Sequence, residues 1–434
     1  MKIVIIGSGM AGCGAAHQLH AENMNSIMYD KNSHYGGQTA TNTYESGFTF
    51  DEGPHISFTK VERLQKRLAE NVNFQYETLN TYVNNYWQGH WIKHPVQCNL
   101  YGLPTDLVVK IISDFIEAQN SGDQEINNYA EWLRAALGKT FAETFPMKYT
   151  VKYHTTTADN MSTDWLGPRL YRPTLEEVLR GSLSPTTADV HYVDNFRYPS
   201  RCGFVSYLHA FIKQTDLRLA HKLTKIDPKQ KTLHFANGVI DTYDGLISSV
   251  PLPELVPMIV GVPADVLAAA QKLACTTAVV VNLGINRADI LDASWTYFYD
   301  QDICFTRLST PHLQSPNNVP PGTSSLQAEI YFSKKYRPFD HDPDKWIQPV
   351  INDLIRCGIL RETDEILLKN TLVISYANVI FDLERSDALS VVHGYLDDIG
   401  IAYCGRYGEW GYLWTDESFF SGEKAAQKVL NLTK

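Results

Sequence analysis

The stretch KIVIIGSGMAGCGAAHQLHAE, residues 2–22, decides the fold of the N-terminal part of this chain. Its apolar run KIVII predicts a buried strand, and Gly7, Gly9 and Gly12 follow at once in the spacing G-x-G-x-x-G. The residues CGAAHQLHAE then predict a helix. In this order the first glycine allows the tight turn, the second lets a pyrophosphate approach backbone N–H groups, and the third lets the helix pack on the strand. The stretch therefore predicts a Rossmann-like dinucleotide-binding unit.

A second predicted strand follows this helix. The run SIMYD, residues 26–30, ends in Asp30, at the distance along the chain expected for an acidic residue that binds a ribose hydroxyl. We therefore expect both strand ends to contribute to one dinucleotide site. Its predicted members in this part of the chain are Gly7, Gly9, Met10, Ala11, Gly12, Asp30 and Lys31.

The composition is typical of a globular protein with an ample core. The chain has 434 residues, enough for two or three domains, and 44% of them are hydrophobic and 20% charged. The net charge is −10 and no basic block occurs, which argues against nucleic-acid binding. No apolar run approaches the ~20 residues of a membrane span, and the N-terminal run is too short for a signal peptide. We expect a cytoplasmic protein.

The cysteines give no sign of a metal site. The chain has seven, which are scattered and form no CxxC pair. The sequence therefore predicts neither zinc nor any other metal, and no disulfide framework. We expect buried, reduced thiols.

Two further glycine motifs indicate which dinucleotide is bound. Gly36-Gly37, followed by Gln38, and the motif DEGPHISF at residues 51–58 resemble FAD-binding proteins of the amine oxidase type. In that type a second glycine pair continues the dinucleotide site, and a later turn, here Gly53-Pro54-His55, approaches the isoalloxazine ring. A nicotinamide dehydrogenase would need neither motif. We therefore expect FAD, with Gly36, Gly37, Gln38, Gly53, Pro54 and His55 among its binding residues.

A remote segment is expected to complete the FAD-binding domain. Residues 218–255 predict short strands with a hairpin turn at Asn237-Gly238, and they end in an apolar strand. Flavoproteins of this type use such a segment in the same domain. Leu223 would then contact the adenine side of FAD.

The pattern along the chain predicts an α/β fold with three parts. Residues 1–59, 190–265 and 385–434 are expected to form the Rossmann-like FAD-binding domain. Residues 60–189 read as an inserted, mainly helical domain, since stretches such as PTDLVVKIISDFIEAQN carry one apolar face. Residues 266–384 contain β-rich runs such as TTAVVVNLGIN and predict an antiparallel β-sheet substrate domain.

The order of motifs resembles one family over nearly the whole chain. The chain is similar to UDP-galactopyranose mutases, particularly the longer eukaryotic type, within the superfamily of FAD proteins that includes amine oxidases and protoporphyrinogen oxidases. The motifs that carry the resemblance are DEGPHISF, HPVQCNLYGLP, TTTADNMSTDWLGPRL, NFRYPSRCGF, WTYFYDQDICFTRL and CGRYGEWGYLW…DESFFSGEKAA, in the family's order.

The resemblance implies a mutase that interconverts the pyranose and furanose forms of a nucleotide-diphosphate sugar, as in polysaccharide biosynthesis. In this family the reduced flavin attacks the anomeric carbon through N5, the nucleoside diphosphate leaves, and the sugar recloses with no net redox change. Such a site needs cations and phenols on the diphosphate, which is both anchor and leaving group. NADPH or NADH could serve as the external reductant. Whether the chain forms a homo-oligomer is left open.

The resemblance also extends to single positions. Arg169 and Arg307 stand where the family has two diphosphate-binding arginines, and Tyr297 and Tyr412 stand where family tyrosines bind the same phosphates. His55 stands on the loop beside flavin N5. The implied catalytic residues are therefore His55, Arg169 and Arg307.

Amides and the C-terminal segment extend the implied site. The substrate-pocket amides of the family correspond to Gln97, Asn99 and Asn195. Arg406 would lie near the flavin ring, and Tyr412 would reach from the flavin to the substrate phosphate. A final helix, expected from about residue 421, would point its N-terminus at the pyrimidine edge and stabilise the anionic reduced flavin.

The sequence departs from the family where the base should bind. The family stacks uracil between a tyrosine and a phenylalanine, and the corresponding residues here are His94 and Val96. Stacking on an aromatic ring contributes roughly 1–3 kcal/mol per base in nucleic-acid binders, so its loss is substantial. We expect the grip on the diphosphate to be kept, and the nucleotide and sugar to differ from UDP-galactose.

Two other functions remain open. The chain could be an FAD-dependent oxidoreductase of the amine oxidase or protoporphyrinogen oxidase type, since amine oxidases commonly hold a water near flavin N5 with a lysine. The candidates for that lysine are Lys334 and Lys335, although adjacent lysines at a strand end are more often solvated. A non-catalytic FAD protein is the third alternative.

Overall fold

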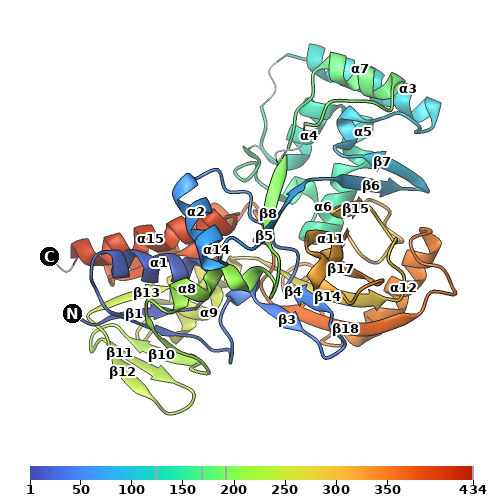
Figure 1. Cartoon of the computed structure of the whole chain (residues 1–434). Coiled ribbons are helices and arrows are strands. Elements are labelled where there is room, and N and C mark those ends of the chain that lie inside the picture. Colours follow the sequence, from blue (N-terminus) through green and yellow to red (C-terminus); the bar gives the residue numbers. More distant parts are fainter. Residues whose placement is uncertain (123–124, 168–169, 191–192, 433–434) are drawn as a thin grey trace.

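The computed structural model of the chain describes residues 1–122, 125–167, 170–190 and 193–432 (Figure 1). Both termini lie at one end of the molecule, beside a parallel sheet. A larger sheet follows in the middle, and a group of helices forms the opposite end. The expected fold class, an α/β fold with a Rossmann-like part, a helical part and a large sheet, is confirmed.

The glycine fingerprint lies at the centre of a five-stranded parallel sheet. In spatial order its strands are β19 (Ile401–Tyr403), β13 (Gly245–Ser248), β1 (Ile3–Ile6), β2 (Ser26–Tyr29) and β9 (Asp216–Arg218). Because β1 has neighbours on both sides and helices over the sheet, all four of its residues are apolar and buried. Helix α1 (Met10–Ala21) starts directly after the turn, as predicted.

The last helix of the chain packs along the first. Helix α15 (Thr415–Leu432) lies beside α1 over the parallel sheet (Figure 1). Two glycines permit this close contact: a Cβ on Gly14 would lie 1.9 Å from the carbonyl oxygen of Phe419, and one on Gly422 would lie 1.9 Å from that of Ala11. The two ends of the chain therefore build one layer of the dinucleotide-binding region.

Middle segments complete this region. A three-stranded sheet consists of β10 (Leu223–Asp227), β11 (Thr232–Phe235) and β12 (Ile240–Thr242), and the predicted turn at Gly238 joins the last two. The remaining helices here are α8 (His209–Ile212), α9 (Leu252–Leu255), α10 (Ala264–Lys272), α13 (Arg385–Asp398) and α14 (Gly405–Gly408).

The large sheet has seven strands and is antiparallel except where β15 pairs with β6. In spatial order its strands are β18 (Ile366–Ile374), β14 (Thr276–Ile285), β17 (Ser324–Ser333), β16 (Arg307–Ser309), β15 (Trp295–Phe298), β6 (Val83–Trp87) and β7 (His90–Lys93). Helix α12 (Ile347–Arg356) buries Val350, Ile351 and Leu354 in the core of this sheet. Helix α11 (Pro311–Gln314) lies beside β17.

Strands β6 and β7 come from the segment that the sequence predicted to be mainly helical. The run VNNYWQGHWIK has polar asparagines at positions 84 and 85, which hide the alternation that usually marks a strand. The turn between the strands has positive φ at Gln88 (+46°) and Gly89 (+83°), as in a tight hairpin. The inserted segment therefore extends the large sheet as well as adding helices.

The helices of this segment form the end of the molecule farthest from the termini (Figure 1). They are α3 (Thr105–Asn120), α4 (Tyr129–Leu137), α5 (Lys139–Thr144), α6 (Pro146–His154) and α7 (Leu175–Leu183). Helix α2 (Glu62–Asn71) is separate from them, because its Leu64 and Leu68 pack in the same core as α1 and α15. The domain boundaries given above stay a prediction.

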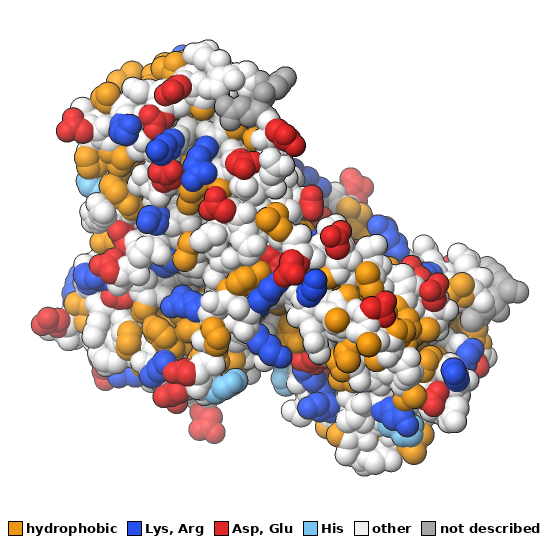
Figure 2. Space-filling model, turned by 180° about the vertical axis from the view of Figure 1, so that it is seen from behind, with side chains coloured by type: hydrophobic (Ala, Val, Ile, Leu, Met, Phe, Trp, Pro, Cys, Tyr) orange, Lys and Arg blue, Asp and Glu red, His pale blue; other side chains and the backbone are white. Residues whose placement is uncertain are grey.

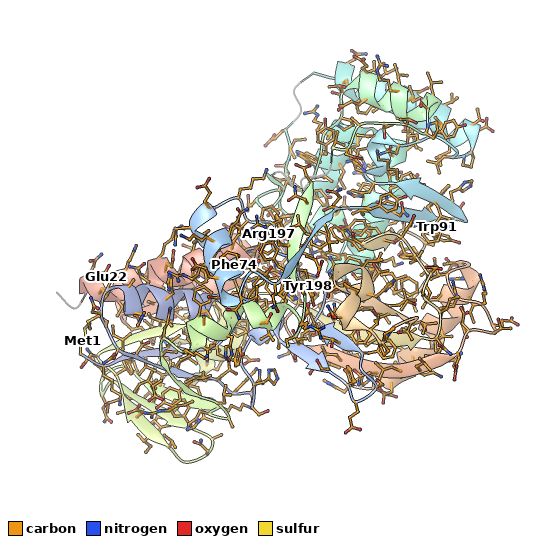
Figure 3. All side chains as sticks on the ribbon, in the orientation of Figure 1. Met1, Glu22, Phe74, Trp91, Arg197 and Tyr198 are labelled. Carbon is orange, nitrogen blue, oxygen red and sulfur yellow. The ribbon has the colours of Figure 1, made fainter. Side chains whose placement is uncertain are left out.

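Two short pairs of strands join these parts. The ribbon of β5 (Tyr76–Asn80) and β8 (Asn195–Pro199) crosses the middle of the molecule. Figure 3 shows Tyr198 of this ribbon at the centre, and its hydroxyl donates a 2.7 Å hydrogen bond to Asp51 Oδ2. Asp51 ends β4 (Thr49–Asp51), which pairs with β3 (Thr41–Thr43), directly before the Gly53-Pro54-His55 turn. The ribbon thus anchors that turn.

Among the residues that the model describes, no helix is long and apolar enough to cross a bilayer. Figure 2 shows Lys and Arg side chains mixed with Asp and Glu over the visible face, rather than gathered in one area.

Candidate active site

A cavity of about 760 Å³ lies where the two sheets and the helical part meet. Its wall includes the turn after β1, the turn after β4, helix α6, strands of the large sheet and the segment that leads into α15. Ligand sites are typically ≈ 300–1,000 Å³ in volume, so this cavity is of the size expected for a cofactor and part of a substrate.

The turn after β1 is shaped for a phosphate. Gly7 has φ +103°, and a Cβ there would lie 2.2 Å from Ser249 Oγ; a Cβ on Gly12 would lie 2.0 Å from the carbonyl oxygen of Gly7. Gly9 is the N-cap of α1, and Met10 and Ala11 line the cavity. The first N–H groups of a helix have no acceptor within the helix, so this end of α1 suits a pyrophosphate. The residues therefore fit the dinucleotide that the sequence predicts.

Asp30 holds the same turn in shape and lies on the cavity wall with Lys31. Its Oδ2 accepts hydrogen bonds from the backbone N–H and the hydroxyl of Ser8, at 2.8 Å and 2.6 Å. Its Oδ1 accepts from the backbone N–H of Asn32 at 2.9 Å. A carboxylate can accept further bonds on both oxygens, so Asp30 can still bind a ribose hydroxyl.

The second glycine pair lies against the first motif. Gly36 pairs with Gly9 through a parallel bridge, and a Cβ on Gly37 would lie 3.1 Å from Gly9 Cα. Gln38 lines the cavity and its side-chain amide donates to the carbonyl of Tyr376. Leu223 lines the end of the cavity that Asp30 also lines. The four predicted segments of the FAD site are thus brought together.

The turn after β4 brings His55 to the cavity, next to Gly53 and Pro54. The Nδ1 of His55 lies 2.9 Å from the carbonyl oxygen of Gly53, and its ring packs on Phe204 with the centroids 5.6 Å apart. Burial lowers the pKa of His55 to about 4. The imidazole is therefore neutral at physiological pH.

Arg406 is held on the cavity wall by backbone carbonyls. Its Nε and Nη2 donate to the carbonyl of Leu413 at 2.9 Å and 2.6 Å, and its Nη1 donates to that of Ala377 at 3.3 Å. Its guanidinium carbon lies 5.2 Å from the ring centre of Tyr412. A fixed positive charge therefore faces the end of the cavity where the flavin ring is expected.

The final helix begins earlier than the sequence predicted. It starts at Thr415 rather than near Ser421, and Trp414, Thr415 and Ser418 line the cavity. Ser421 lies within the helix, and its hydroxyl accepts the backbone N–H of Gly405 at 2.8 Å. The prediction was wrong in this start, which Asp416 and Glu417 in the first turn of the helix favour. The helix N-terminus still points to the cavity, but the residues that line the cavity there, Trp414, Thr415 and Ser418, were not predicted.

Arg307 reaches the cavity from β16, but it is paired. Its Nη2 lies 2.9 Å from Glu329 Oε1, its Nε donates to Glu329 Oε2, and the Tyr331 hydroxyl donates to Oε1 at 2.9 Å. Burial alone would lower the pKa of Arg307, but the facing Glu329 raises it well above its ordinary value. Sequence reasoning missed Glu329, although a glutamate inside the apolar strand SSLQAEIYF is an available signal.

Tyrosine hydroxyls surround this ion pair. Tyr297 accepts a hydrogen bond from Trp295 Nε1 at 3.0 Å. The hydroxyls of Tyr412 and Tyr153 lie 2.8 Å apart, and Tyr153 donates to Asn378 Oδ1 at 3.1 Å. The predicted Tyr297 and Tyr412 therefore lie on one cavity wall with Arg307, while Tyr153 of α6 was missed.

The predicted amides lie elsewhere. The side-chain amide of Gln97 donates to the carbonyl of Tyr171 at 2.9 Å, and that of Asn99 donates to the carbonyl of Pro95 at 2.8 Å. Asn195 lines a smaller neighbouring pocket. These three side chains do not line the cavity, and the amides of the first two bond to backbone carbonyls instead. Arg169 lies outside the described residues.

The buried histidines predict a loss of stability in mild acid. Burial lowers the pKa of His55 to about 4 and that of His154 to about 3, so an unfolded chain binds protons below pH 6.5 that the folded chain does not. Asp51, whose pKa burial raises to about 6, acts in the opposite direction. From pH 7 to 5.5 we expect roughly 1 kcal/mol of loss per histidine and a somewhat smaller gain from Asp51.

This balance can be measured by urea unfolding at the two pH values. The free energy of unfolding should be lower at pH 5.5 by roughly 1–2 kcal/mol. An equal or higher free energy at pH 5.5 would show that these imidazoles are not held neutral.

Comparison with known proteins agrees with this geometry. The family model of the NAD(P)-binding Rossmann-like domain matches residues 5–70. A curated relative, 4,4'-diaponeurosporene oxygenase from Staphylococcus haemolyticus, is 46% identical over 56 residues, which are 13% of this chain and only 11% of that protein. The match to the family model therefore concerns the dinucleotide-binding end.

Solved structures match the whole chain. The crystal structure of a reduced UDP-galactopyranose mutase superposes with a TM-score of 0.93 at 27% identity, over 99% of this chain and 96% of that one. A structure described as a protoporphyrinogen oxidase from Exiguobacterium shares the fold with a TM-score of 0.75 at 16% identity, over 100% and 99% of the two chains. By its fold over the full length and by its glycine fingerprint, the chain is similar to the flavoprotein UDP-galactopyranose mutase, and it shares its fold with the protoporphyrinogen oxidase structure.

Proposed function

We propose that this flavoenzyme is a nucleotide-sugar mutase, which interconverts pyranose and furanose forms and requires FAD in its reduced form. The observation that carries the proposal is Arg307 on the same cavity wall as Tyr297 and Tyr412, beside the end where Arg406 and His55 face the expected flavin. NADPH or NADH would act as the external reductant, and the substrate would be a nucleotide-diphosphate sugar.

Arg307, Tyr297 and Tyr412 would bind the diphosphate. Glu329 holds the Nε and Nη2 of Arg307, so Nη1 would be the nitrogen that binds a ligand. Because Trp295 donates to the oxygen of Tyr297, the phenol hydrogen of Tyr297 can donate to a phosphate oxygen. Charge-assisted bonds of this kind stabilise the diphosphate both as an anchor and as a leaving group. Arg169, outside the described residues, would add a second cation.

The flavin end is arranged to hold an anionic ring. Reduced FAD would supply the nucleophilic nitrogen for the anomeric carbon. Arg406 places a fixed positive charge there, and the N-terminus of α15 adds a partial positive charge. The neutral His55 donates from Nδ1 to the carbonyl of Gly53, so its Nε2 can accept one hydrogen bond without adding charge.

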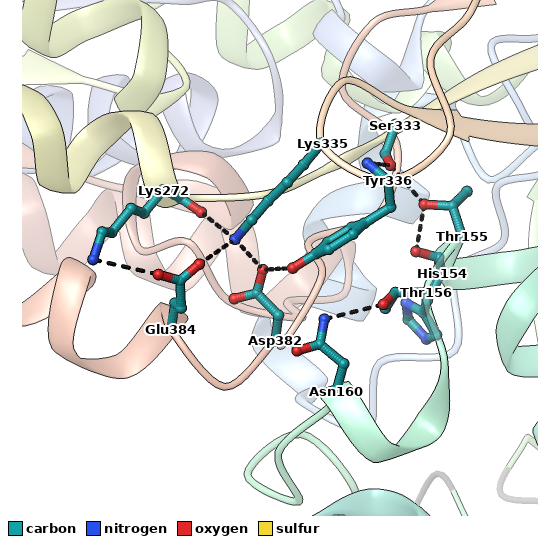
Figure 4. Close-up of polar contacts among 10 residues, drawn as sticks. All are labelled: His154, Thr155, Thr156, Asn160, Lys272, Ser333, Lys335, Tyr336, Asp382 and Glu384. Carbon is teal, nitrogen blue, oxygen red and sulfur yellow. Dashed lines mark hydrogen bonds and ion pairs between the residues drawn. The ribbon is translucent and has the colours of Figure 1, made fainter.

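An amine oxidase-type oxidoreductase commonly has a lysine near flavin N5, and neither Lys334 nor Lys335 lies in that position. Figure 4 shows that Lys335 is held by two carboxylates: its Nζ lies 2.9 Å from Asp382 Oδ2 and 2.8 Å from Glu384 Oε2. Neither it nor Lys334 lines the cavity, and the described lysines that do, Lys31 and Lys222, lie at the predicted adenosine end. The alternative still has the shared fold of the protoporphyrinogen oxidase structure in its favour.

Turnover of a nucleotide sugar separates the two functions. The FAD-loaded protein is reduced anaerobically and incubated with UDP-galactose and with other nucleotide sugars, and the ring forms are separated by chromatography. We expect a furanose product with reduced protein and none with oxidised protein. Bleaching of the oxidised flavin by amines, without any ring interconversion, would favour the oxidoreductase instead.

A further inference from the structure

A smaller pocket lies beside the segment that follows the His55 turn. Its volume is about 210 Å³, and it is formed by residues 57–60, helix α2, and the ribbon of β5 and β8. Among the described residues, Phe58 and Val193 alone also line the large cavity, so the two spaces are neighbours with different walls. Ligand sites are typically ≈ 300–1,000 Å³ in volume, so this pocket suits a small ligand.

The pocket is built on the ribbon that anchors the His55 turn. Arg197 and Tyr198 are neighbours on β8 (Figure 3), and successive side chains of a strand point to opposite faces. Tyr198 therefore bonds to Asp51 on one face, and Arg197 lines the pocket on the other. Backbone hydrogen bonds of 2.7 Å and 3.0 Å pair Arg197 with Ser57, two residues after His55. A ligand in the pocket would thus contact the framework of this turn.

Arg197 brings an unused guanidinium to the pocket. Its guanidinium carbon lies 4.9 Å from the ring centre of Tyr76, so the aromatic face holds the planar group in place. Within the described part of the chain, none of its five N–H donors has a hydrogen-bond or ion-pair partner. A guanidinium that is held in place with free donors suits an oxyanion, because its fork can bind two oxygens at once.

Two other side chains add donors to this wall. Lys60 is exposed and forms no ion pair among the described residues. Tyr207 is 1% exposed as a residue, but its hydroxyl oxygen keeps accessible surface and has no hydrogen-bond partner in the part of the chain that the structure describes. Burial raises the pKa of Tyr207, against the opposing effect of the nearby Arg197, so the phenol is a neutral O–H donor.

The charge of the pocket favours an anion. Of the described residues on its wall, Arg197 and Lys60 are cationic and Asp194 is acidic. Asp194 is exposed and forms no ion pair with either of these cations. Two positive charges and a phenol therefore remain available to a ligand, against one solvated carboxylate.

We propose that this pocket is a second ligand site, which binds a phosphate group through Arg197, Lys60 and the hydroxyl of Tyr207. Charge-assisted hydrogen bonds to phosphate are roughly twice as strong as neutral ones, which makes the two cations the main contacts. The volume suits inorganic phosphate or the phosphate end of a small monoester rather than a whole nucleotide. The site does not depend on the proposed function, since it requires only the folded protein.

The test is calorimetric titration of the FAD-loaded protein at constant ionic strength. The probes are inorganic phosphate, a hexose 1-phosphate, and succinate as a planar dianion of the same charge. Arg197→Gln removes the main cation, and Tyr207→Phe removes only a hydroxyl that no described residue binds. The control is Arg201→Gln, because Arg201 is exposed, lies four residues along the chain and lines neither pocket.

We expect Arg197→Gln to weaken phosphate binding about tenfold or more, as for the loss of a charge-assisted hydrogen bond. Tyr207→Phe should weaken it roughly fivefold, as for a neutral one. Arg201→Gln should bind phosphate like the wild type, which separates the site from a general effect of net charge. Since Tyr207→Phe changes one atom, it tests the site even if Arg197→Gln fails to fold.

The probes distinguish the source of the phosphate group. Tighter binding of the hexose 1-phosphate indicates a monoester as the ligand, and equal or tighter binding of inorganic phosphate indicates the free ion; either result supports the proposal. A wild type that binds neither at millimolar concentration would overturn it, as would succinate binding as tightly as phosphate. Binding that is unchanged in both Arg197→Gln and Tyr207→Phe would place the phosphate elsewhere and also overturn the proposal.

Discussion

Replacing Arg307 by alanine is expected to weaken nucleoside-diphosphate binding by about 100-fold or more, because a charge-assisted contact in a closed site is lost. The same change leaves Glu329, which is 3% exposed, without its cation. Breaking a buried ion pair by removing one partner typically costs roughly 3–5 kcal/mol of folding free energy. Affinity is measured by titration of the reduced, FAD-loaded protein, and stability by urea unfolding.

A double variant separates these two effects. Arg307→Ala combined with Glu329→Gln removes the stranded charge, so we expect it to recover most of the lost stability and none of the lost affinity. Arg307→Lys should keep the charge but lose the two-point geometry toward Glu329, and should fall between wild type and alanine. An Arg307→Ala protein that is folded, loaded with FAD and binds the diphosphate normally would remove the main support for a diphosphate substrate.

The second large effect is expected at Gly14, where α1 meets α15. In Gly14→Ala the new Cβ would lie 1.9 Å from the backbone oxygen of Phe419, which cannot move without displacing α15. We expect a loss of roughly 3 kcal/mol or more, at the upper end of what overpacking costs. FAD should also be lost, since α1 carries the phosphate-binding turn. The flavin absorbance per protein and the melting temperature report the two losses.

Gly394→Ala provides the matched control. Gly394 lies in α13, where a Cβ would meet nothing within 4 Å. Alanine in a helix is favoured over glycine by roughly 0.5–1 kcal/mol, so this variant should be slightly more stable than the wild type and should bind the same amount of FAD. If Gly14→Ala were as stable and as well loaded as Gly394→Ala, the packing of α1 on α15 described here would be wrong.

The parts of the fold that could be predicted are those with strong local signals. The strand, glycine turn and helix at the N-terminus are determined by residues within 20 positions of each other, and they occur as predicted. Strands β6 and β7 could not be found in this way, because β6 is stabilised by pairing with β15, more than 200 residues later in the chain. Long-range pairing of a polar strand leaves no periodic signal.

The same distinction holds for the site. Arg307, Tyr297 and Tyr412 were implied by the resemblance to the mutase family, and in the structure all three line one cavity. Glu329 and His154 were not predicted, because their importance depends on their surroundings in the folded protein. Glu329 faces the guanidinium of Arg307, and within the described residues His154 has a buried ring nitrogen without a partner. Gln97 and Asn99 were predicted to face the substrate, but in the structure their amides bond to backbone carbonyls of nearby turns.

If sugar chemistry takes place on the flavin, covalent trapping will detect it. The FAD-loaded protein is reduced anaerobically, mixed with a nucleotide sugar that it binds, treated with cyanoborohydride, and its flavin is weighed by mass spectrometry. We expect a flavin heavier by one sugar. A flavin of unchanged mass, from protein shown to be fully reduced and saturated with the nucleotide sugar, would contradict the mutase and favour an FAD-dependent oxidoreductase.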